Sequence, residues 1–264
     1  MTKTACITGM TLGERHAYIM DTLHKYGSAS VSALAEQLKV SEVTIRKDLT
    51  ILENKKMIYR AHGSAILMNP YVNDRHISEK EKLNAVEKQA IGKKAAEMIT
   101  PNDSILIASG TTMLFFAREI KPQGHLTAIT SAINIAYLLS GNPNIDVIQL
   151  GGIIRNRSVS VVGNYAERML PDFSCSKLYL GVDGLDVDYG LSTTNIMEVN
   201  LDREMIRTAQ KIIILADSSK FGRRGFCKIC DVDEVDQIIT DSGISPHMLS
   251  KLQERGIEVT VVDI

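Results

Sequence analysis

The sequence of 264 residues has no long apolar run and few cysteines, and each shortage excludes a class of protein. No stretch reaches the ~18 apolar residues of a membrane span, and the first residues contain no secretory signal, so we expect no membrane partner. Four cysteines in a chain of this size do not make a disulfide framework, which favours a cytoplasmic protein. The hydrophobic content of 44% excludes a disordered or fibrous chain, and the length suits two domains.

Several catalytic and cofactor motifs are also missing. The sequence contains no Walker-type phosphate loop, and no G-x-G-x-x-G follows a strand, so we expect no bound nucleotide. It contains no H-E-x-x-H and no G-x-S-x-G, and we expect no catalytic residues. Cys227 and Cys230 form a C-x-x-C, but no second pair lies at the spacing of a zinc site. We therefore expect neither a metal nor a cofactor, and assign this pair no role.

Positive charge is concentrated near the N-terminus. Residues 1–69 contain nine Lys and Arg against six Asp and Glu, a net charge of +3, whereas the remaining residues contain 21 against 25, a net charge of −4. An excess of three charges is weak evidence for a polyanion partner by itself. The positions of these basic residues on the predicted helices and hairpin are therefore the stronger evidence for a polyanion partner.

The basic part has the pattern of a winged helix-turn-helix. Apolar residues repeat at helical spacing in three segments: Ile19, Leu23 and Tyr26, ending at Gly27; Val31, Leu34 and Leu38, with Ser32 as the cap; and Ile45, Leu49 and Leu52, capped by Ser41 and ending near Asn54. Residues 39–41 separate the last two helices. Met57, Tyr59, Ala65 and Leu67 then alternate around a turn at residues 62–64, which predicts a β-hairpin.

The side of the third helix opposite its apolar stripe is polar and basic. A helix-turn-helix reader places such a face in the major groove of double-stranded DNA, where Arg and Thr meet base edges and Lys meets phosphates. Thr44 and Arg46 are the candidate base readers. The full set of candidate DNA-binding residues is Ser41, Val43, Thr44, Arg46, Lys47, Thr50, Lys55, Lys56, Arg60, His62 and Gly63. The alternative is a solvated charged face, and for Asp48 we expect a structural pairing with Arg46 or a neighbour.

The rest of the chain has the pattern of an α/β domain. Residues 70–77 are polar and read as a linker, and a helix from about Ser78 to Ile99 follows. Short apolar strands then alternate with helices through residues 78–264, which predicts a mainly parallel sheet covered on both faces.

Polar and glycine residues follow several of the predicted strands. Ligands bind outside the carboxyl ends of parallel strands. The loop Ser109–Thr112 precedes a helix and suits an anion. Lys220 could neutralise a phosphate, while Asp183 and Glu198 could accept hydrogen bonds from sugar hydroxyls. Gly151, Gly152 and Gly184 complete this set. The alternatives are a Ser/Thr helix cap, turn residues and surface ion pairs.

These motifs resemble the DeoR family of bacterial transcriptional regulators. Residues 41–49 match the S-x-x-T-I-R-x-D-L core of its DNA-binding signature. Residues 76–264 resemble its sensor domain, which is similar in fold to ribose-5-phosphate isomerase and CoA-transferase proteins; the matches are SGTT at 109–112, LGG at 150–152, GVDGLD at 181–186, Glu198 and LADSSKFG at 215–222. The resemblance implies a repressor of a sugar-utilisation operon, a phosphorylated sugar as effector, and a homo-oligomer, dimer or tetramer.

The chain departs from the family pattern at four positions. Ser64 replaces the second Gly of the usual H-G-G-A, Ala108 replaces an acidic residue, Ser131 an Asn, and Asp202 a Lys. The last three changes remove or invert a polar contact near the expected effector site, in which we include Ser131 with Ser109, Gly110, Thr111 and Thr112. The identity of the effector therefore does not carry over from other members.

Two other functions fit parts of the sequence. A phosphosugar isomerase with an accessory DNA-binding domain would use Asp183 or Glu198 to transfer protons. A protein-interaction module would use the winged helix for a protein partner. We favour the regulator because DNA binding explains the N-terminal part and needs no turnover.

Overall fold

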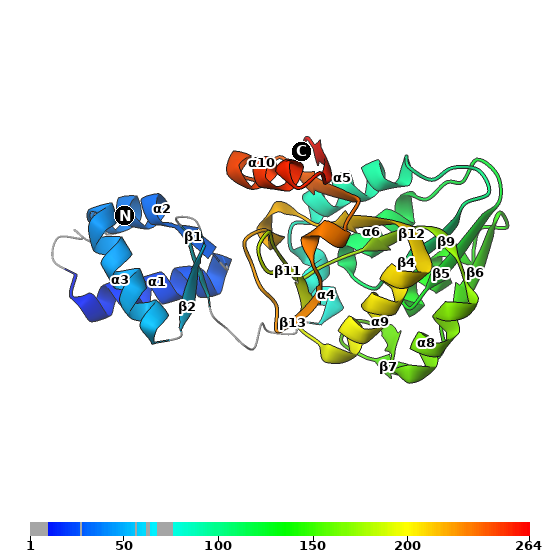
Figure 1. Cartoon of the computed structure of the whole chain (residues 1–264), viewed down its shortest axis with the longest axis horizontal. Helices are drawn as coiled ribbons and strands as arrows, with labels where there is room; N and C mark the ends of the chain where they lie inside the picture. Colours follow the sequence, from blue (N-terminus) through cyan, green and yellow to red (C-terminus); the bar gives the residue numbers. More distant parts are fainter. Residues whose placement is uncertain (1–9, 27, 56, 62–63, 68–75) are drawn as a thin grey trace, which may run out of the picture. The chain divides into compact units, whose positions relative to one another are not determined.

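The structure is a computed structural model that describes residues 10–26, 28–55, 57–61, 64–67 and 76–264. The chain divides into two compact units, Met1–Pro70 and Tyr71–Ile264, whose elements are labelled in Figure 1. No helix among the described residues combines the length and the apolar character needed to span a membrane.

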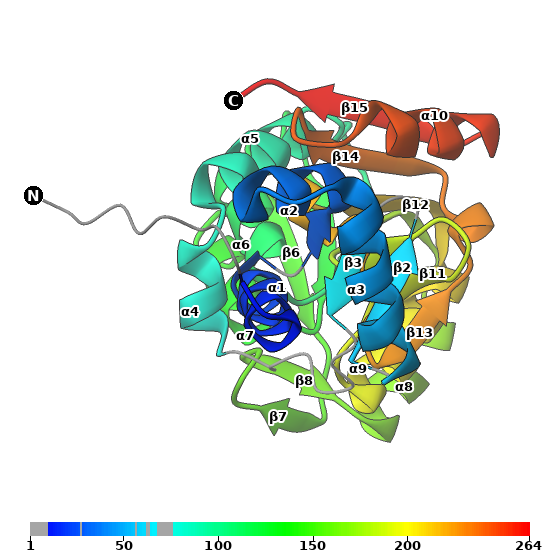
Figure 2. The ribbon, with the colours of Figure 1, turned by 90° about the vertical axis from the view of Figure 1, so that its left-hand side faces the viewer.

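The first unit is a winged helix-turn-helix, as the sequence predicts. Its elements are α1 (Leu12–Tyr26), β1 (Ser28–Ser30), α2 (Val31–Leu38), α3 (Glu42–Asn54), β2 (Ile58–Ala61) and β3 (Ser64–Leu67). The strands form an antiparallel sheet in the order β1-β3-β2. Figure 2 shows the hairpin β2–β3 beside α3. The predicted apolar stripes form the core, where Ile19, Leu23, Ile45 and Leu49 are fully buried.

Helix starts in this unit are set by serine caps. The Ser41 side chain accepts a hydrogen bond from the Thr44 amide at 3.1 Å, which confirms the predicted cap of α3. The prediction of Ser32 as the cap of α2 is wrong, because Ser30 accepts from the Ala33 amide at 3.1 Å instead. Lys39, with φ of 53°, makes the left-handed turn that ends α2.

The strands of the wing form where the alternating pattern predicts them. Ala65, one of the predicted alternating residues, is fully buried. The prediction is wrong at Met57, which precedes β2 and is 39% exposed, whereas its neighbour Ile58 is fully buried. The side chains of Tyr59 and Leu67 lie outside the described part of the wing. Strand β1 has only three residues and no periodic signal.

The second unit is built on a seven-stranded parallel sheet in the order β15-β14-β12-β9-β4-β5-β6. Its strands are β4 (Ser104–Ile107), β5 (Leu126–Thr130), β6 (Ile145–Gln149), β9 (Cys175–Leu180), β12 (Ala209–Leu215), β14 (Gln237–Asp241) and β15 (Glu258–Val262). The helices are α4 (Ile77–Lys82), α5 (Ala85–Ala96), α6 (Thr111–Glu119), α7 (Ile133–Leu139), α8 (Asn164–Met169), α9 (Ile196–Thr208) and α10 (Pro246–Glu254).

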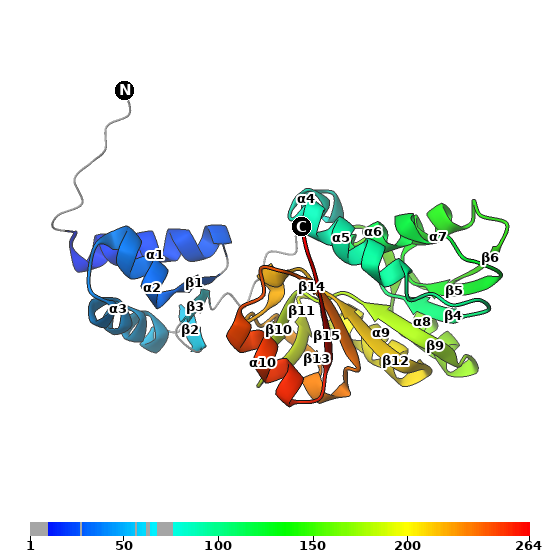
Figure 3. The same ribbon diagram turned by 90° about the horizontal axis from the view of Figure 1, so that it is seen from above.

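Both faces of this sheet are covered, which explains its continuous apolar strands. Along β4, Ile105 and Ile107 pack into one core with α5, α6 and α7, while Leu106 packs into the other with α8, α9 and α10. Figure 3 shows these helices on opposite sides of the sheet. The prediction of a mainly parallel sheet covered on both faces is therefore confirmed. The strands β12, β9 and β4 are neighbours in this parallel sheet, so their carboxyl ends lie side by side at the same end of the strands.

Two features of the second unit differ from the sequence prediction. The helix expected from Ser78 to Ile99 is two helices, α4 and α5, broken at Leu83 and Asn84, where Asn84 adopts φ of 50°. Two small antiparallel sheets were also not predicted: β7 (Ile153–Arg155) with β8 (Ser160–Val162), and β10 (Gly184–Asp186) with β11 (Gly190–Thr193) and β13 (Cys227–Cys230). Of these strands only β8 is expected from the sequence, where residues 158–162 have a strand pattern. The other four have three or four residues each, which is too short for an alternating pattern to be recognised.

Candidate functional site

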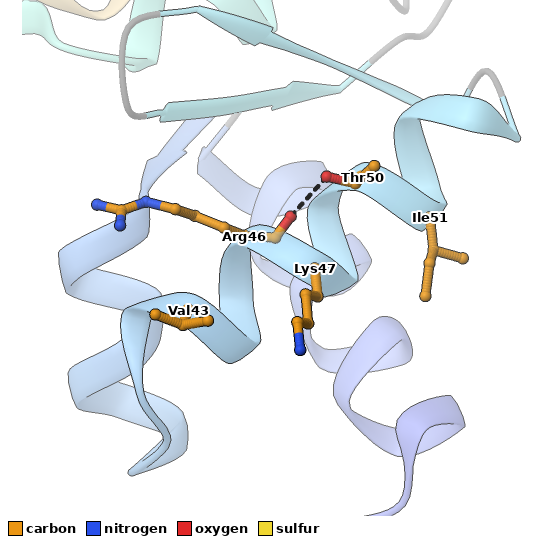
Figure 4. Close-up of a pocket in the computed structure, with 5 residues that line it drawn as sticks. All are labelled: Val43, Arg46, Lys47, Thr50 and Ile51. Atoms are coloured by element: carbon orange, nitrogen blue, oxygen red, sulfur yellow. Dashed lines mark hydrogen bonds between the residues drawn. The ribbon is translucent and has the colours of Figure 1, made fainter.

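One face of α3 is exposed and carries the predicted DNA-reading side chains. Val43, Arg46, Lys47, Thr50 and Ile51 line a hollow on this face (Figure 4). The Arg46 side chain is 54% exposed, and its one ion pair among the described residues is with Glu42, at 2.7 Å and one helical turn away. An exposed pair of this kind is worth little and exchanges readily for a phosphate or a base. The face can therefore be presented to a nucleic acid.

The wing is tied to this helix by a second arginine. Arg60 Nη1 donates to Thr50 Oγ1 at 3.0 Å, and Thr50 Oγ1 donates to the Arg46 carbonyl at 2.8 Å. The Thr44 hydroxyl bonds to Ser41 Oγ at 2.9 Å, so the predicted base reader also takes part in the helix cap. Lys55 follows the last turn of α3 and is exposed. The predicted contacts Lys56, His62 and Gly63 lie outside the described residues.

Asp48 has the structural role that the sequence suggests, but with a different partner. It is 2% exposed, and its two carboxylate oxygens accept from Nε and Nη2 of Arg15 at 2.7 and 3.0 Å. The expected pairing with Arg46 is wrong, because Asp48 faces α1 on the buried side of the helix. This two-pronged ion pair fixes α3 against α1.

In the second unit, the anion loop after β4 leads directly into α6. Ser109 and Gly110 precede the helix, and Thr111 and Thr112 are its first residues, 7% and 8% exposed. Gly110 has φ of 134°, and no described atom lies within 4 Å of the place where a Cβ would stand. No side chain caps this helix, so the alternative of a plain Ser/Thr cap is not what forms here. The first amides of α6 are left for another acceptor.

Asp183, after β9, is the centre of a polar network. Its carboxylate accepts from Lys80 Nζ at 3.1 Å and from the hydroxyls of Thr193 and Thr194 at 3.0 and 3.2 Å. Burial raises the pKa of Asp183, but Lys80 and Lys220 and these hydrogen bonds outweigh it and hold the pKa below its usual range. Asp183 is therefore ionised at neutral pH.

Asp217, after β12, is the centre of a second network. It is 1% exposed, and Oδ1 accepts from Asn84 Nδ2 at 2.8 Å and from the amide and hydroxyl of Ser219. Burial raises the pKa of Asp217, but Lys220 and these hydrogen bonds lower it further than burial raises it. Its second oxygen, Oδ2, is buried and has no hydrogen-bond partner within the described part of the chain.

Glu198, in the first turn of α9, binds Arg155 of β7 at 2.8 Å. Burial raises the pKa of Glu198, with Asp183 adding to the shift and Arg155 opposing it. Asp202 lies one turn further along the same helix, where the family pattern has Lys. Burial, Glu198 and Asp183 together raise the pKa of Asp202 well above its usual range. At the position where the family pattern has a Lys, this chain thus carries a carboxyl whose neutral form is favoured by its surroundings.

Two lysines complete this polar region. Lys88, on α5, is 3% exposed, and Nζ donates to the carbonyls of Lys80 and Leu83 at the end of α4. Lys220 is half-buried beside Asp217. Burial, together with Lys220 and Lys80, lowers the pKa of Lys88 to about 8, against the opposing effect of Asp217 and Glu87.

Four of the predicted effector residues have clear structural roles. The carbonyl of Ser131 accepts from the Val161 amide at 2.8 Å. A Cβ on Gly152 would lie 2.8 Å from Val162 O, and a Cβ on Gly184 would lie 2.6 Å from Arg223 O, so close packing requires both glycines. Gly151 donates its amide to Met169 Sδ at 3.4 Å. Their part in effector binding stays a prediction.

The structure therefore brings Asp183, Asp217 and Lys220 of the strand-end loops together with residues that sequence reasoning missed, namely Lys80, Asn84, Lys88 and Arg155. A Cβ added to Gly181 would stand 3.9 Å from Ser109 O. The loop after β9 therefore lies next to the anion loop. One signal in the sequence pointed to Lys88. It occupies the buried stripe of α5 with Ile91, Gly92 and Ala95.

No group of three or more potential metal ligands occurs among the residues that the structure describes. Cys227 and Cys230 lie at opposite ends of β13, opposite Thr193 and Leu191 in the register. Burial raises the pKa of Cys230 to about 12 and that of Cys175 to about 11, so both thiols stay protonated.

Comparison with known proteins gives matches over nearly the whole chain. Residues 15–70 match the DeoR-like helix-turn-helix domain, and residues 83–242 match the DeoR C-terminal sensor domain. The chain is 36% identical over 255 residues to the uncharacterized HTH-type transcriptional regulator YulB of Bacillus subtilis, covering 97% of this chain and 98% of YulB. It is also 36% identical over 259 residues to the putative aga operon transcriptional repressor of Escherichia coli O157:H7, covering 97% and 95%.

Solved structures show a more distant likeness. Ribose 5-phosphate isomerase A of Methanocaldococcus jannaschii matches 52% of this chain and 55% of its own at 15% identity, with a TM-score of 0.37. The sorbitol operon regulator SorC of Klebsiella pneumoniae matches 94% and 95% at 11% identity, with a TM-score of 0.40. Such scores carry no argument about function. On the two domain matches and the two relatives, the chain belongs to the DeoR family of DNA-binding transcriptional regulators.

Proposed function

We propose that this protein is a repressor of a sugar-utilisation operon, which binds operator DNA through α3 and is controlled by a phosphorylated sugar bound at the strand-end loops. The observation that carries the proposal is the exposed face of α3, with Arg46, Lys47 and Thr50 pointing outward from a helix that Ser41 caps and Asp48 anchors. A rigid helix with exchangeable charges on its outer side is what major-groove reading requires. A regulator of this kind works in the cytoplasm.

In this proposal the side chains of α3 divide into two roles. Arg46 and Thr44, near the start of the helix, meet base edges, with Val43 supplying apolar contact. Ser41, Lys47, Lys55, Lys56, Arg60 and the wing residues His62 and Gly63 meet the phosphate backbone and set affinity. Thr50 holds the Arg60 guanidinium at 3.0 Å, which places a backbone contact beside the reading helix.

The effector site is supported by the charges at the carboxyl ends of β4, β9 and β12. The uncapped amides of α6 and the Lys220 ammonium suit a phosphate, and Asp183, Asp217 and Glu198 suit hydroxyl groups. An isomerase would need a free carboxylate as general base. Asp183 accepts from Lys80 and Glu198 accepts from Arg155, so the two carboxylates that the sequence offers as bases are both held in ion pairs, which favours a binding role for them.

An exposed apolar patch supports a homo-oligomer. Ile153 and Ile154 of β7, Tyr165 of α8 and Ile196 of α9 are 60%, 59%, 77% and 58% exposed. Ile153 and the start of α9 lie close to Gly163, since a Cβ on Gly163 would stand 3.7 Å from Ile153 Cδ1 and 3.6 Å from Met197 Cε. Apolar patches of this kind mark interaction sites. A second copy is the natural occupant, because helix-turn-helix readers bind two half-sites as symmetric dimers.

The direct test is selection of DNA fragments by the purified protein, followed by titration of the selected and a scrambled fragment at several salt concentrations. We expect tight binding of the selected fragment that weakens as salt rises, because phosphate contacts release counterions. A thermal-shift screen of sugar phosphates, run beside a turnover assay, tests the sensor. Stabilisation without turnover supports it, and turnover would support the isomerase. Salt-independent binding, or no preference for any fragment, would contradict the regulator.

A further inference from the structure

The exposed face of α3 contains apolar side chains as well as charged ones. The hollow of Figure 4 is lined by Val43, Arg46, Lys47, Thr50 and Ile51. Val43 is 58% exposed, and Ile51 follows it by eight residues on the same side of the helix, with Lys47 between them. Single exposed apolar residues are ordinary. Two in one hollow beside two cations indicate a partner that is apolar at these points and anionic around them.

The hydroxyl groups near this hollow are already engaged. Thr50 Oγ1 donates its proton to the Arg46 carbonyl at 2.8 Å and accepts from Arg60 Nη1 at 3.0 Å. The Thr44 hydroxyl shares a hydrogen bond with Ser41 Oγ at 2.9 Å. A hydroxyl has one proton to donate, so Thr50 has none left for a base. The hollow therefore offers a partner methyl groups and nearby cations rather than hydroxyl donors.

Double-stranded DNA presents a matching surface at one kind of base. In the major groove thymine carries a C5-methyl group, and the other three ordinary bases carry no methyl group. The phosphates along both sides of the groove supply the negative charge that suits the two cations. 5-Methylcytosine carries a methyl group at the same ring position, so the shared chemistry is the 5-methyl group of a pyrimidine. Thymine is the source that unmodified DNA contains.

We infer that the hollow receives thymine methyl groups, so that Val43 and Ile51 select thymine at defined positions of each operator half-site. This inference rests on the proposed function and extends it from base reading in general to one base. At a rise of about 1.5 Å per residue, the two side chains lie about 12 Å apart along α3. Base pairs are stacked about 3.4 Å apart. The two side chains therefore meet different thymines, no more than about four base pairs apart.

The experiment replaces thymine by uracil, which lacks only the C5-methyl group, at one position at a time in the selected operator fragment. The full-length wild type, Val43→Ala, Ile51→Ala and Leu12→Ala are titrated on each fragment at one salt concentration. Leu12 is 47% exposed on α1 and does not line the hollow, so its variant removes apolar surface elsewhere in the same unit. The fragments are selected from unmodified DNA, so an effect of uracil is assigned to thymine and not to methylated cytosine.

Each variant is compared through the ratio of its affinities for the thymine and uracil fragments. A partial loss of folded protein lowers both affinities alike and leaves this ratio unchanged. Val43 is exposed, and Ala favours a helix more than Val does, so Val43→Ala should not unfold α3. Ile51 is half-buried, and Ile51→Val supplies a milder second variant at that position.

We expect the wild type and Leu12→Ala to bind about fourfold more weakly when uracil replaces a thymine that the hollow contacts, as for the burial of one methyl-sized group. Val43→Ala should lose this discrimination at one position and Ile51→Ala at the other, while Ile51→Val keeps part of it. Equal binding of thymine and uracil fragments by the wild type, or discrimination that survives in both Ala variants, would overturn this inference and leave the proposed function standing. A wild type that prefers no fragment would overturn both.

Discussion

Arg46 and Asp183 show how differently the two units hold their functional charges. The Arg46 side chain is 54% exposed and pairs with Glu42, which is 46% exposed. The Asp183 side chain is 15% exposed and accepts hydrogen bonds from Lys80, Thr193 and Thr194. A surface that reads a large polyanion must exchange its partners on contact, whereas a site for a small molecule is positioned in advance.

Asp48 is buried and held by its partner, as Asp183 is, although it lies in the DNA-binding unit. Replacing it with Ala leaves Arg15, whose side chain is 16% exposed, without its carboxylate. We expect a loss of about 3 kcal/mol in the free energy of unfolding of this unit, as for other broken buried pairs. Urea denaturation measures it, with Asp48→Asn as a control that keeps an acceptor and loses less. If Asp48→Ala lowered the free energy of unfolding by less than about 0.5 kcal/mol, the Asp48–Arg15 pair would contribute no more than an exposed ion pair does.

Lys88 gives the comparison a pH dependence. The pKa of Lys88 is about 8 in the folded chain, against its ordinary value of 10.5 in the unfolded chain, so between these values the unfolded state binds more protons. The free energy of unfolding of the wild type should therefore rise relative to Lys88→Met as pH increases from 8 to 10.5. The expected gain is roughly 3 kcal/mol, at 1.36 kcal/mol per pKa unit. Chemical denaturation of both proteins across this range measures it, and a constant difference would contradict the burial of a charged Lys88.

The apolar patch tests whether the second unit also supplies the oligomer. Ile154→Asp places a charge on a side chain that is 59% exposed, so folding should be little changed. We expect self-association to weaken by at least about tenfold, because a charge enters an apolar contact. Sedimentation at several concentrations measures it, and Lys82→Met is the control on a different surface. Unchanged association would place the interface elsewhere.

The exposed pair on α3 should have the smallest effect. Removing Glu42, which is 46% exposed, breaks the pair with Arg46, and we expect less than about 0.5 kcal/mol of lost stability. DNA affinity should rise slightly, because Arg46 no longer has to leave a carboxylate. Thermal melting and DNA titration of Glu42→Ala measure both. Marked destabilisation would mean that this pair is structural.

The same contrast explains how much the sequence could predict. Helix α3 could be predicted because the spacing of Ile45, Leu49 and Leu52 marks the face of the helix that is buried. The exposed face of α3 is then the opposite one. The partner of Asp183 is 103 residues away, at Lys80, in a charged stretch that resembles a solvated face. No local period encodes a contact between such distant segments.

Smaller errors have the same origin. The break at Asn84 depends on a left-handed residue held by Asp217, 133 positions away, and not on a local proline or glycine. The pairing of Asp48 with Arg15 depends on how α1 crosses α3. The strand-end loops could be predicted because parallel strands share one ligand-binding edge, but which side chains meet there depends on the packing of α4 and α5.

The central claim is that the outer face of α3 reads bases, and one pair of variants tests it most directly. Arg46→Ala and Lys47→Ala each remove one charge from neighbouring positions of the same exposed face, and are titrated on the selected operator fragment and on random DNA. We expect Arg46→Ala to lose roughly 1 to 3 kcal/mol on the operator and much less on random DNA, and Lys47→Ala to lose affinity equally on both. Equal, small losses for the two variants on both DNAs would contradict the account.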